Sequence, residues 1–253
     1  MVDNSCSVFE NDFIYRLRPA TSLTIDELKN HYLWFSKPKG FKDVNDANIG
    51  AFMKNTKQLY DVAKMRMSKH GVDELCGLMK NTGICCFTKT MVSKNERCHF
   101  PNGKSPSILV AYNRKMLEDF WVNHPKYPQG DCFKDVLYVQ NPLVLNEYGE
   151  YDILVSKTEY GEKYETFCSL TSSEKGWDKL MFLLLTRLDV KFAKQNEARI
   201  ILGGRSLEYL DLTSKGYKFE IPKESISSVY YYEDTPVDFL EQLKGLGINI
   251  EKI

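Results

Sequence analysis

Short runs of β-forming residues recur along the chain and are interrupted by polar turns and by a few segments with helical periodicity. The runs in the first half occupy residues 13–17, 32–36, 83–88 and 107–112. Those that dominate the end occupy residues 196–202, 207–212, 217–221 and 226–232. This alternation predicts an α+β fold with mostly antiparallel sheets and with helices concentrated in the N-terminal half. No linker or repeat interrupts it, so we expect one domain over residues 1–253.

Helix signals are fewer than strand signals. Apolar residues at helical spacing predict helices over 51–70, 72–80 and 173–192. Thr24 and Glu27 have the spacing of a capping box, and Asn113 can cap a helix that starts after it. Thr235 and Pro236 predict the cap and first turn of a last helix. The polar segment 91–106 predicts an exposed loop, and 141–165 fits a strand pair or a helix.

The composition fits a folded protein without a bulk charge preference. Hydrophobic residues make up 43% and charged residues 27%, which is enough apolar material for a core. Lys and Arg number 34, as do Asp and Glu, so attraction to nucleic acid or anionic lipid is not expected. The most apolar run, residues 180–185, is far shorter than the ~20 residues of a membrane helix. Without a secretory signal, the chain is expected to be soluble and cytoplasmic.

Cysteine and histidine placement argues against disulfides and metal. Seven cysteines is an odd number, and a cytosolic protein keeps its thiols reduced. Cys85, Cys86, Cys98 and His99 are the nearest approach to a metal cluster, but they lack paired ligand spacing. We therefore expect free thiols, with Cys85 and Cys86 in a buried strand, and no metal site.

Several polar residues stand inside or beside predicted strands. They are Arg16, Ser36, Gln195, Glu197 and Arg199. Each has an ordinary structural explanation, because a strand arginine usually faces solvent and a strand-end serine usually belongs to a turn. Glu197 and Arg199 lie two residues apart on one strand face and can form an ion pair. Gln195 shares that face, so the three side chains can also line a common site.

A family resemblance links these residues. Residues 14–17 (IYRL), 28–41 (LKNHYLWFSKPKGF), 83–88 (GICCFT) and 191–200 (KFAKQNEARI) follow one another as they do in the domain of unknown function 2971 family. The sequence resembles that family almost end to end. The order of Arg, Ser and a late Gln-x-Glu is also similar to the ADP-ribosyltransferase superfamily.

The second resemblance implies roles for named residues. Arg16 and Ser36, with Tyr15 and Phe35 beside them, would bind NAD, while Glu197 would act on the nicotinamide ribose. Gln195 would orient the acceptor. The implied protein is an NAD-dependent ADP-ribosyltransferase or NAD glycohydrolase with an ADP-ribosyltransferase-like fold, in a toxin or phage-defence setting. Its acceptor would be an unknown protein or nucleic acid, modified at an amide, thiol or nucleobase rather than at arginine.

The chemistry requires residues of these types. Cleavage of the bond to nicotinamide develops positive charge on the ribose, which a carboxylate bonded to the 2′-hydroxyl stabilises. A guanidinium can hold phosphate oxygens with two donors. We therefore predict that Arg16, Ser36 and Glu197 line one concave site.

Two other classes of function stay open. In a non-catalytic nucleic-acid- or protein-binding module, the aromatic residues and the cations of 89–104 would contact the partner. With zero net charge, however, a solvated loop is the better explanation of these cations. A nuclease finds no support, because no carboxylate cluster has metal-ligand spacing.

Overall fold

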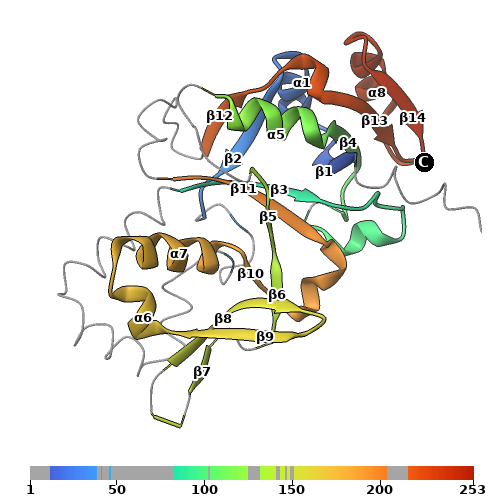
Figure 1. Cartoon of the computed structure of the whole chain (residues 1–253). Coiled ribbons are helices and arrows are strands. Elements are labelled where there is room, and N and C mark those ends of the chain that lie inside the picture. Colours follow the sequence, from blue (N-terminus) through green and yellow to red (C-terminus); the bar gives the residue numbers. More distant parts are fainter. Residues whose placement is uncertain are drawn as a thin grey trace, which may run out of the picture. The chain divides into compact units, whose positions relative to one another are not determined.

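Figure 1 shows the computed structural model, which describes residues 12–38, 41, 46, 82–101, 103–124, 132–140, 143–145, 147–148, 151–203 and 216–253. The chain divides into two compact units. Unit 1 takes its described residues from 1–36, 84–134 and 194–253, and unit 2 from 37–83 and 135–193. The predicted helices at 51–70 and 72–80 and the predicted strand at 207–212 lie outside the described residues.

Unit 1 is built on one large sheet (Figure 1). Its strands are β1 (Phe13–Pro19), β2 (Tyr32–Ser36), β3 (Gly83–Thr88), β4 (Ser107–Asn113), β11 (Glu197–Leu202), β12 (Gly216–Glu220), β13 (Ile226–Tyr231) and β14 (Asn249–Lys252). They run in the order β12-β2-β3-β1-β4-β13-β14, and β11 pairs with β3. Strand β13 pairs with β14 in parallel, whereas the pairs β12–β2, β2–β3, β3–β1, β1–β4 and β4–β13 are antiparallel. The predicted strands at both ends of the chain are therefore confirmed, apart from 207–212, which lies outside the described residues.

One face of this sheet carries the main core of unit 1. Apolar side chains of the strands pack there with helices α1 (Ser22–Lys29), α5 (Arg114–Val122) and α8 (Val237–Lys244). Aromatic rings fill much of this core, and the ring centroids of Trp121 and Phe219 lie 4.9 Å apart. Alternate residues of each strand point to this side, as the period of two requires.

Helix caps show where local signals hold. The Asn113 side chain accepts a hydrogen bond from the backbone N–H of Met116 at 2.9 Å, so the predicted cap of α5 is confirmed. The predicted capping box is wrong, because α1 begins at Ser22 and Thr24 lies inside it. The Thr24 hydroxyl donates to the carbonyl of Pro19 instead, at 2.6 Å. The last helix is capped by Pro236, one residue later than predicted.

The segment 91–106 is not simply an exposed loop. It contains a 3-10 turn, η2 (Glu96–His99), and Val92, Arg97 and Gly103 are buried. The Arg97 guanidinium bonds both carboxylate oxygens of Asp234, at 3.0 and 2.7 Å. A charged residue that looks solvated in the sequence therefore anchors the segment.

Unit 2 holds smaller elements. They are β6 (Leu137–Val139), β7 (Leu143–Leu145), β8 (Tyr151–Thr158), β9 (Gly161–Thr166), α6 (Phe167–Thr171), α7 (Glu174–Leu185) and β10 (Arg187–Asp189). Strands β7-β8-β9 form an antiparallel sheet, and β10 pairs with β6 in parallel. In the sequence, the short β5 (Lys134–Asp135) and the 3-10 turn η3 (Val190–Gln195) each contain a boundary between the two units, and the 3-10 turn η5 (Lys223–Ser225) belongs to unit 1.

The middle of the chain corrects one prediction and decides between the two alternatives of another. The helix expected over 173–192 ends at Leu185, because Thr186 caps it and a strand follows. The ambiguous segment 141–165 forms strands where it is described. Within the described residues, helices lie in both halves of the chain. Because residues 51–70 and 72–80 lie outside them, the expected concentration of helices in the N-terminal half stays a prediction.

The α+β class and the mostly antiparallel sheet are confirmed. The ADP-ribosyltransferase-like fold and the single domain over residues 1–253 stay predictions. No helix in the described part of the chain is both long and apolar enough to cross a membrane.

Candidate functional site

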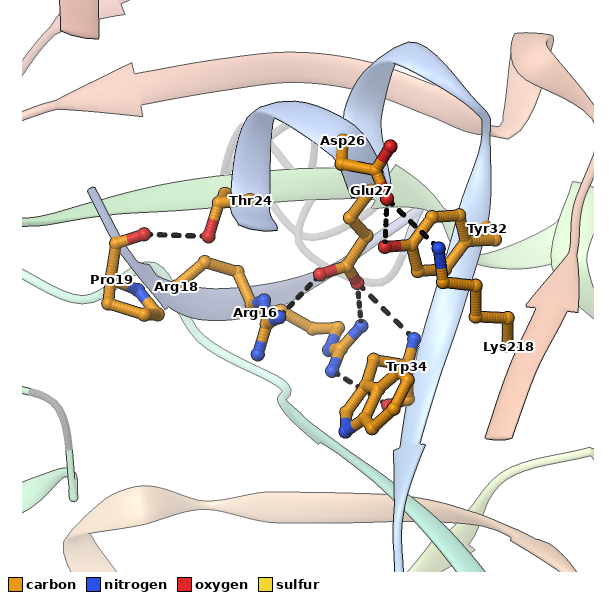
Figure 2. A network of polar contacts seen from close by, with 9 residues as sticks. All are labelled: Arg16, Arg18, Pro19, Thr24, Asp26, Glu27, Tyr32, Trp34 and Lys218. Carbon is orange, nitrogen blue, oxygen red and sulfur yellow. Dashed lines mark hydrogen bonds and ion pairs between the residues drawn. The ribbon is translucent and has the colours of Figure 1, made fainter. Parts of the chain in front are cut away.

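Arg16 lies in the middle of β1, on the core face, and is 6% exposed. Its guanidinium forms an ion pair with Glu27 of α1 at 2.5 Å (Figure 2). It also donates to the backbone carbonyl of Trp34 at 3.2 Å, while the Trp34 N–H donates to the Glu27 carboxylate at 3.4 Å. Arg16 and Glu27 therefore satisfy backbone groups of β2, which is a structural role.

Arg18, two residues further along β1, reaches the same carboxylate. Its guanidinium lies 2.5 Å from the second oxygen of Glu27 (Figure 2). The side chain of Glu27 is 2% exposed and that of Arg18 is 18% exposed. Two cations thus share one buried anion. We call Arg16, Arg18 and Glu27 the Glu27 cluster.

Burial and charge shift the titration of groups around this cluster. Burial alone would lower the pKa of Arg16, but nearby acidic groups, with the Glu27 carboxylate among them, outweigh it, and the pKa lies above its usual value. Burial raises the pKa of the Cys85 thiol to about 12, and the nearby Glu27 and Glu197 add to that rise. At neutral pH, Arg16 is therefore charged and Cys85 is a neutral thiol.

A second, more exposed network borders the cluster. Asp26 of α1 accepts hydrogen bonds from the Tyr32 hydroxyl at 2.8 Å and from the Lys218 ammonium at 3.0 Å (Figure 2). These bonds hold the pKa of Asp26 below its usual value. The network connects α1, β2 and β12 at their solvent side.

The predicted glutamate lies on β11. Glu197 is 7% exposed and its carboxylate accepts a hydrogen bond from Arg199 Nε at 2.7 Å, while Arg199 is fully buried. Gln195 is also buried and donates its amide N–H to the His99 carbonyl at 2.7 Å. Between them Asn196 has a positive φ of 42°, which asparagine tolerates better than most residues. The ion-pair alternative for Glu197 and Arg199 is therefore present in the structure.

Strand pairing places three predicted residues on one side of the sheet. Tyr15 pairs with Thr88, and Ser36 pairs with Ile84, so all four side chains point to one face. On β11, Ala198 and Ile200 point into the core. Glu197 alternates with them and therefore points away from the core, to the same face as Tyr15 and Ser36. We call this side, which carries Tyr15, Ser36 and Glu197, the second face.

Arg16 and Phe35 do not share that face. Both point to the core face, where Phe35 is fully buried among aromatic rings. The structure thus does not bring Arg16 together with Ser36 and Glu197, and this part of the predicted geometry is wrong. Successive side chains of a strand point to opposite faces of the sheet, so Arg16, which follows Tyr15, points to the other side.

Positions along β3 locate the second-face residues more closely. The Lys89 N–H, just after β3, donates to the Asn196 carbonyl at 3.0 Å, so Glu197 lies near the Thr88 end. Tyr15 lies at that end too. Ser36 lies at the Ile84 end, about 13 Å away at ~3.3 Å per residue.

The cysteine and metal predictions concern unit 1 and unit 2 alike. The five cysteines within the described residues are free thiols, namely Cys85, Cys86, Cys98, Cys132 and Cys168. Cys6 and Cys76 lie outside the described residues. No group of potential metal ligands occurs in the part of the chain that the structure describes. Two of the four loop cations proposed for nucleic acid, Lys94 and Arg97, are paired with Glu233 and Asp234.

Sequence reasoning missed Glu27 and Arg18. The sequence feature that could have revealed them is an Arg-x-Arg pattern in β1 that is followed by helix α1. That helix has two acidic residues, and because Asp26 faces solvent, Glu27 is the one available to the arginines. The capping-box spacing predicts a capping role for Glu27, whereas in the structure its position in α1 turns the side chain toward the sheet.

In comparisons with known proteins, no family model, curated protein or solved structure matches this chain. The family resemblance and the functions that it implies stay predictions.

Proposed function

We propose that this protein cleaves NAD at the nicotinamide ribose and either transfers ADP-ribose or releases it to water, at a site on the second face. The observation that carries the proposal is the common orientation of Glu197, Tyr15 and Ser36 on strands that all pair with β3. Of the six residues expected from the resemblance, these three share a face that is not part of the main core.

Glu197 is the proposed catalytic residue. Its carboxylate would accept a hydrogen bond from the ribose 2′-hydroxyl and stabilise the positive charge that develops on the ribose. The bond between ribose C1′ and the nicotinamide nitrogen breaks, and its electron pair leaves with nicotinamide. Water or an acceptor nucleophile then bonds to C1′ and gives its proton to solvent.

Arg199 and Gln195 support that role. The hydrogen bond from Arg199, at 2.7 Å, holds the Glu197 carboxylate in one orientation. Such fixed geometry reduces the reorganisation needed when charge develops. Gln195 is held by the His99 carbonyl and would orient the acceptor beside Glu197. Tyr15 and Ser36 would contact the bound dinucleotide along β3.

The test is release of nicotinamide from NAD, measured with and without cell lysate as a source of acceptor. We expect Glu197→Gln to lower the rate about a hundred- to a thousand-fold, the usual loss for one preorganised electrostatic contact. NAD affinity should change much less, because the interaction grows mainly in the transition state.

A second variant separates catalysis from stability. Glu197→Gln removes the carboxylate charge to which the buried Arg199 donates, which can lower the melting temperature by itself. Adding Arg199→Met removes both charges and should restore stability without restoring the rate. Wild-type protein that neither binds NAD nor releases nicotinamide would overturn the proposal, as would a double variant that recovers activity.

A further inference from the structure

We propose that Arg18 binds a phosphate oxyanion of a small molecule at the end of β1. The Glu27 cluster contains two guanidinium cations and one carboxylate, which leaves a net charge of +1 in a largely buried place. Buried charges are normally paired, because their desolvation is otherwise costly. This site lies on the core-face side and goes beyond the NAD chemistry proposed for the second face.

The two arginines of the cluster are not equivalent. Arg16 uses its guanidinium on Glu27 and on the Trp34 carbonyl, and is 6% exposed. Arg18 reaches Glu27 with Nη2, and its Nε is buried without a hydrogen-bond partner among the described residues. Its side chain is 18% exposed. Arg18 is therefore the cation of the Glu27 cluster that a ligand in solvent can contact.

No other described carboxylate compensates this charge. Asp26, the neighbour of Glu27, is engaged by Lys218 and the Tyr32 hydroxyl (Figure 2). An anion from outside the chain would complete the pairing. A guanidinium presents several donors in a fixed plane, which matches the oxygens of a phosphate group.

The experiment measures thermal unfolding of the full chain in increasing pyrophosphate at constant ionic strength. We expect a saturable rise in melting temperature for the wild type, since a ligand that binds only the folded state stabilises it. Arg18→Gln should weaken pyrophosphate affinity about 10- to 100-fold, the loss expected for charged hydrogen bonds. Arg114→Gln is the matched control, because Arg114 forms a more exposed ion pair with Glu118 and should leave affinity unchanged.

Further arms identify the ligand chemistry. ADP should act like pyrophosphate, and acetate at equal ionic strength should have little effect. Arg18→Lys keeps the charge and should retain part of the affinity, and the ligand-free melting transition of Arg18→Gln reports whether that variant folds. An absent or non-saturable wild-type response would overturn the proposal, as would equal stabilisation of Arg18→Gln. Because pyrophosphate lacks nicotinamide, either result is independent of NAD cleavage.

Discussion

Glu27 is the buried carboxylate on which two arginines of β1 converge. It is 2% exposed, pairs with Arg16 and Arg18, and accepts a weak hydrogen bond from the Trp34 backbone. An arginine expected to hold NAD is thereby committed to the link between α1, β1 and β2. At this scale, partners decide what a charged residue does, because Arg16 directs its donors to Glu27 and to the Trp34 carbonyl and keeps few for a ligand.

Neighbouring carboxylates allow a direct test of that role. Glu27→Gln leaves two arginines without their anion and should lower the free energy of unfolding by about 3–5 kcal/mol. Asp26→Asn removes the adjacent exposed carboxylate and should cost less than about 1 kcal/mol. Urea unfolding followed by circular dichroism measures both. Similar losses in the two variants would contradict a structural role for the Glu27 cluster.

At the scale of elements, η2 and its flanks are an anchored segment rather than a free loop. The Arg97 guanidinium lies over the Tyr232 ring, 4.3 Å from its centroid, and bonds to Asp234. The Tyr232 hydroxyl donates to the Val92 carbonyl at 2.7 Å. These contacts join η2 to the end of β13 and give the polar sequence a fixed shape.

Gly103 tests how tightly this segment packs. A Cβ at this position would lie 1.4 Å from the carbonyl oxygen of Arg97, so the backbone would have to move. We expect Gly103→Ala to lower stability by about 1–3 kcal/mol, the range for overpacked sites. Gly245→Ala, whose nearest neighbour would be 3.3 Å away, should cost clearly less. Equal melting temperatures of Gly103→Ala and wild type would mean that the segment yields.

At the scale of the whole molecule, ion pairs link segments that are distant in sequence. Asp26 bonds to Lys218, Glu233 to Lys94 and Asp234 to Arg97, and these bonds lower the pKa of all three carboxyl groups. All three are substantially exposed, so solvent weakens each contribution. Because all three pKa values are shifted downward, they all make the folded state less stable when the pH falls.

The sign of the pH dependence follows from these lowered pKa values. The contribution of each carboxylate is present above its ordinary pKa, 3.8 for aspartate and 4.5 for glutamate, and is lost as the pH falls through the folded pKa. We expect the free energy of unfolding to decrease between pH 5 and about pH 3, as measured by urea titration. Salt at about 0.5 M should flatten this decrease by screening. A constant stability over that range would contradict the prediction.

Local sequence determined most of the elements of unit 1. Period-two patterns located β1 to β4 and β11 to β13, and the Asn113 cap was predictable because it depends on residues three apart. The predicted end of α7 was wrong, because the strand that follows it, β10, is stabilised by pairing with β6. Hydrophobic spacing along the sequence carries no information about such pairing.

The candidate site depended on tertiary structure in a different way. The sequence identified Ser36, Gln195 and Glu197 as polar residues in or beside strands, and the resemblance added Tyr15. The second face does carry Tyr15, Ser36 and Glu197. The sequence could not reveal that Arg16 points to the other face, because that depends on strand register and on which side α1 covers. Side-chain type is a local property, whereas the partner of a buried charge is set by segments that only folding brings together.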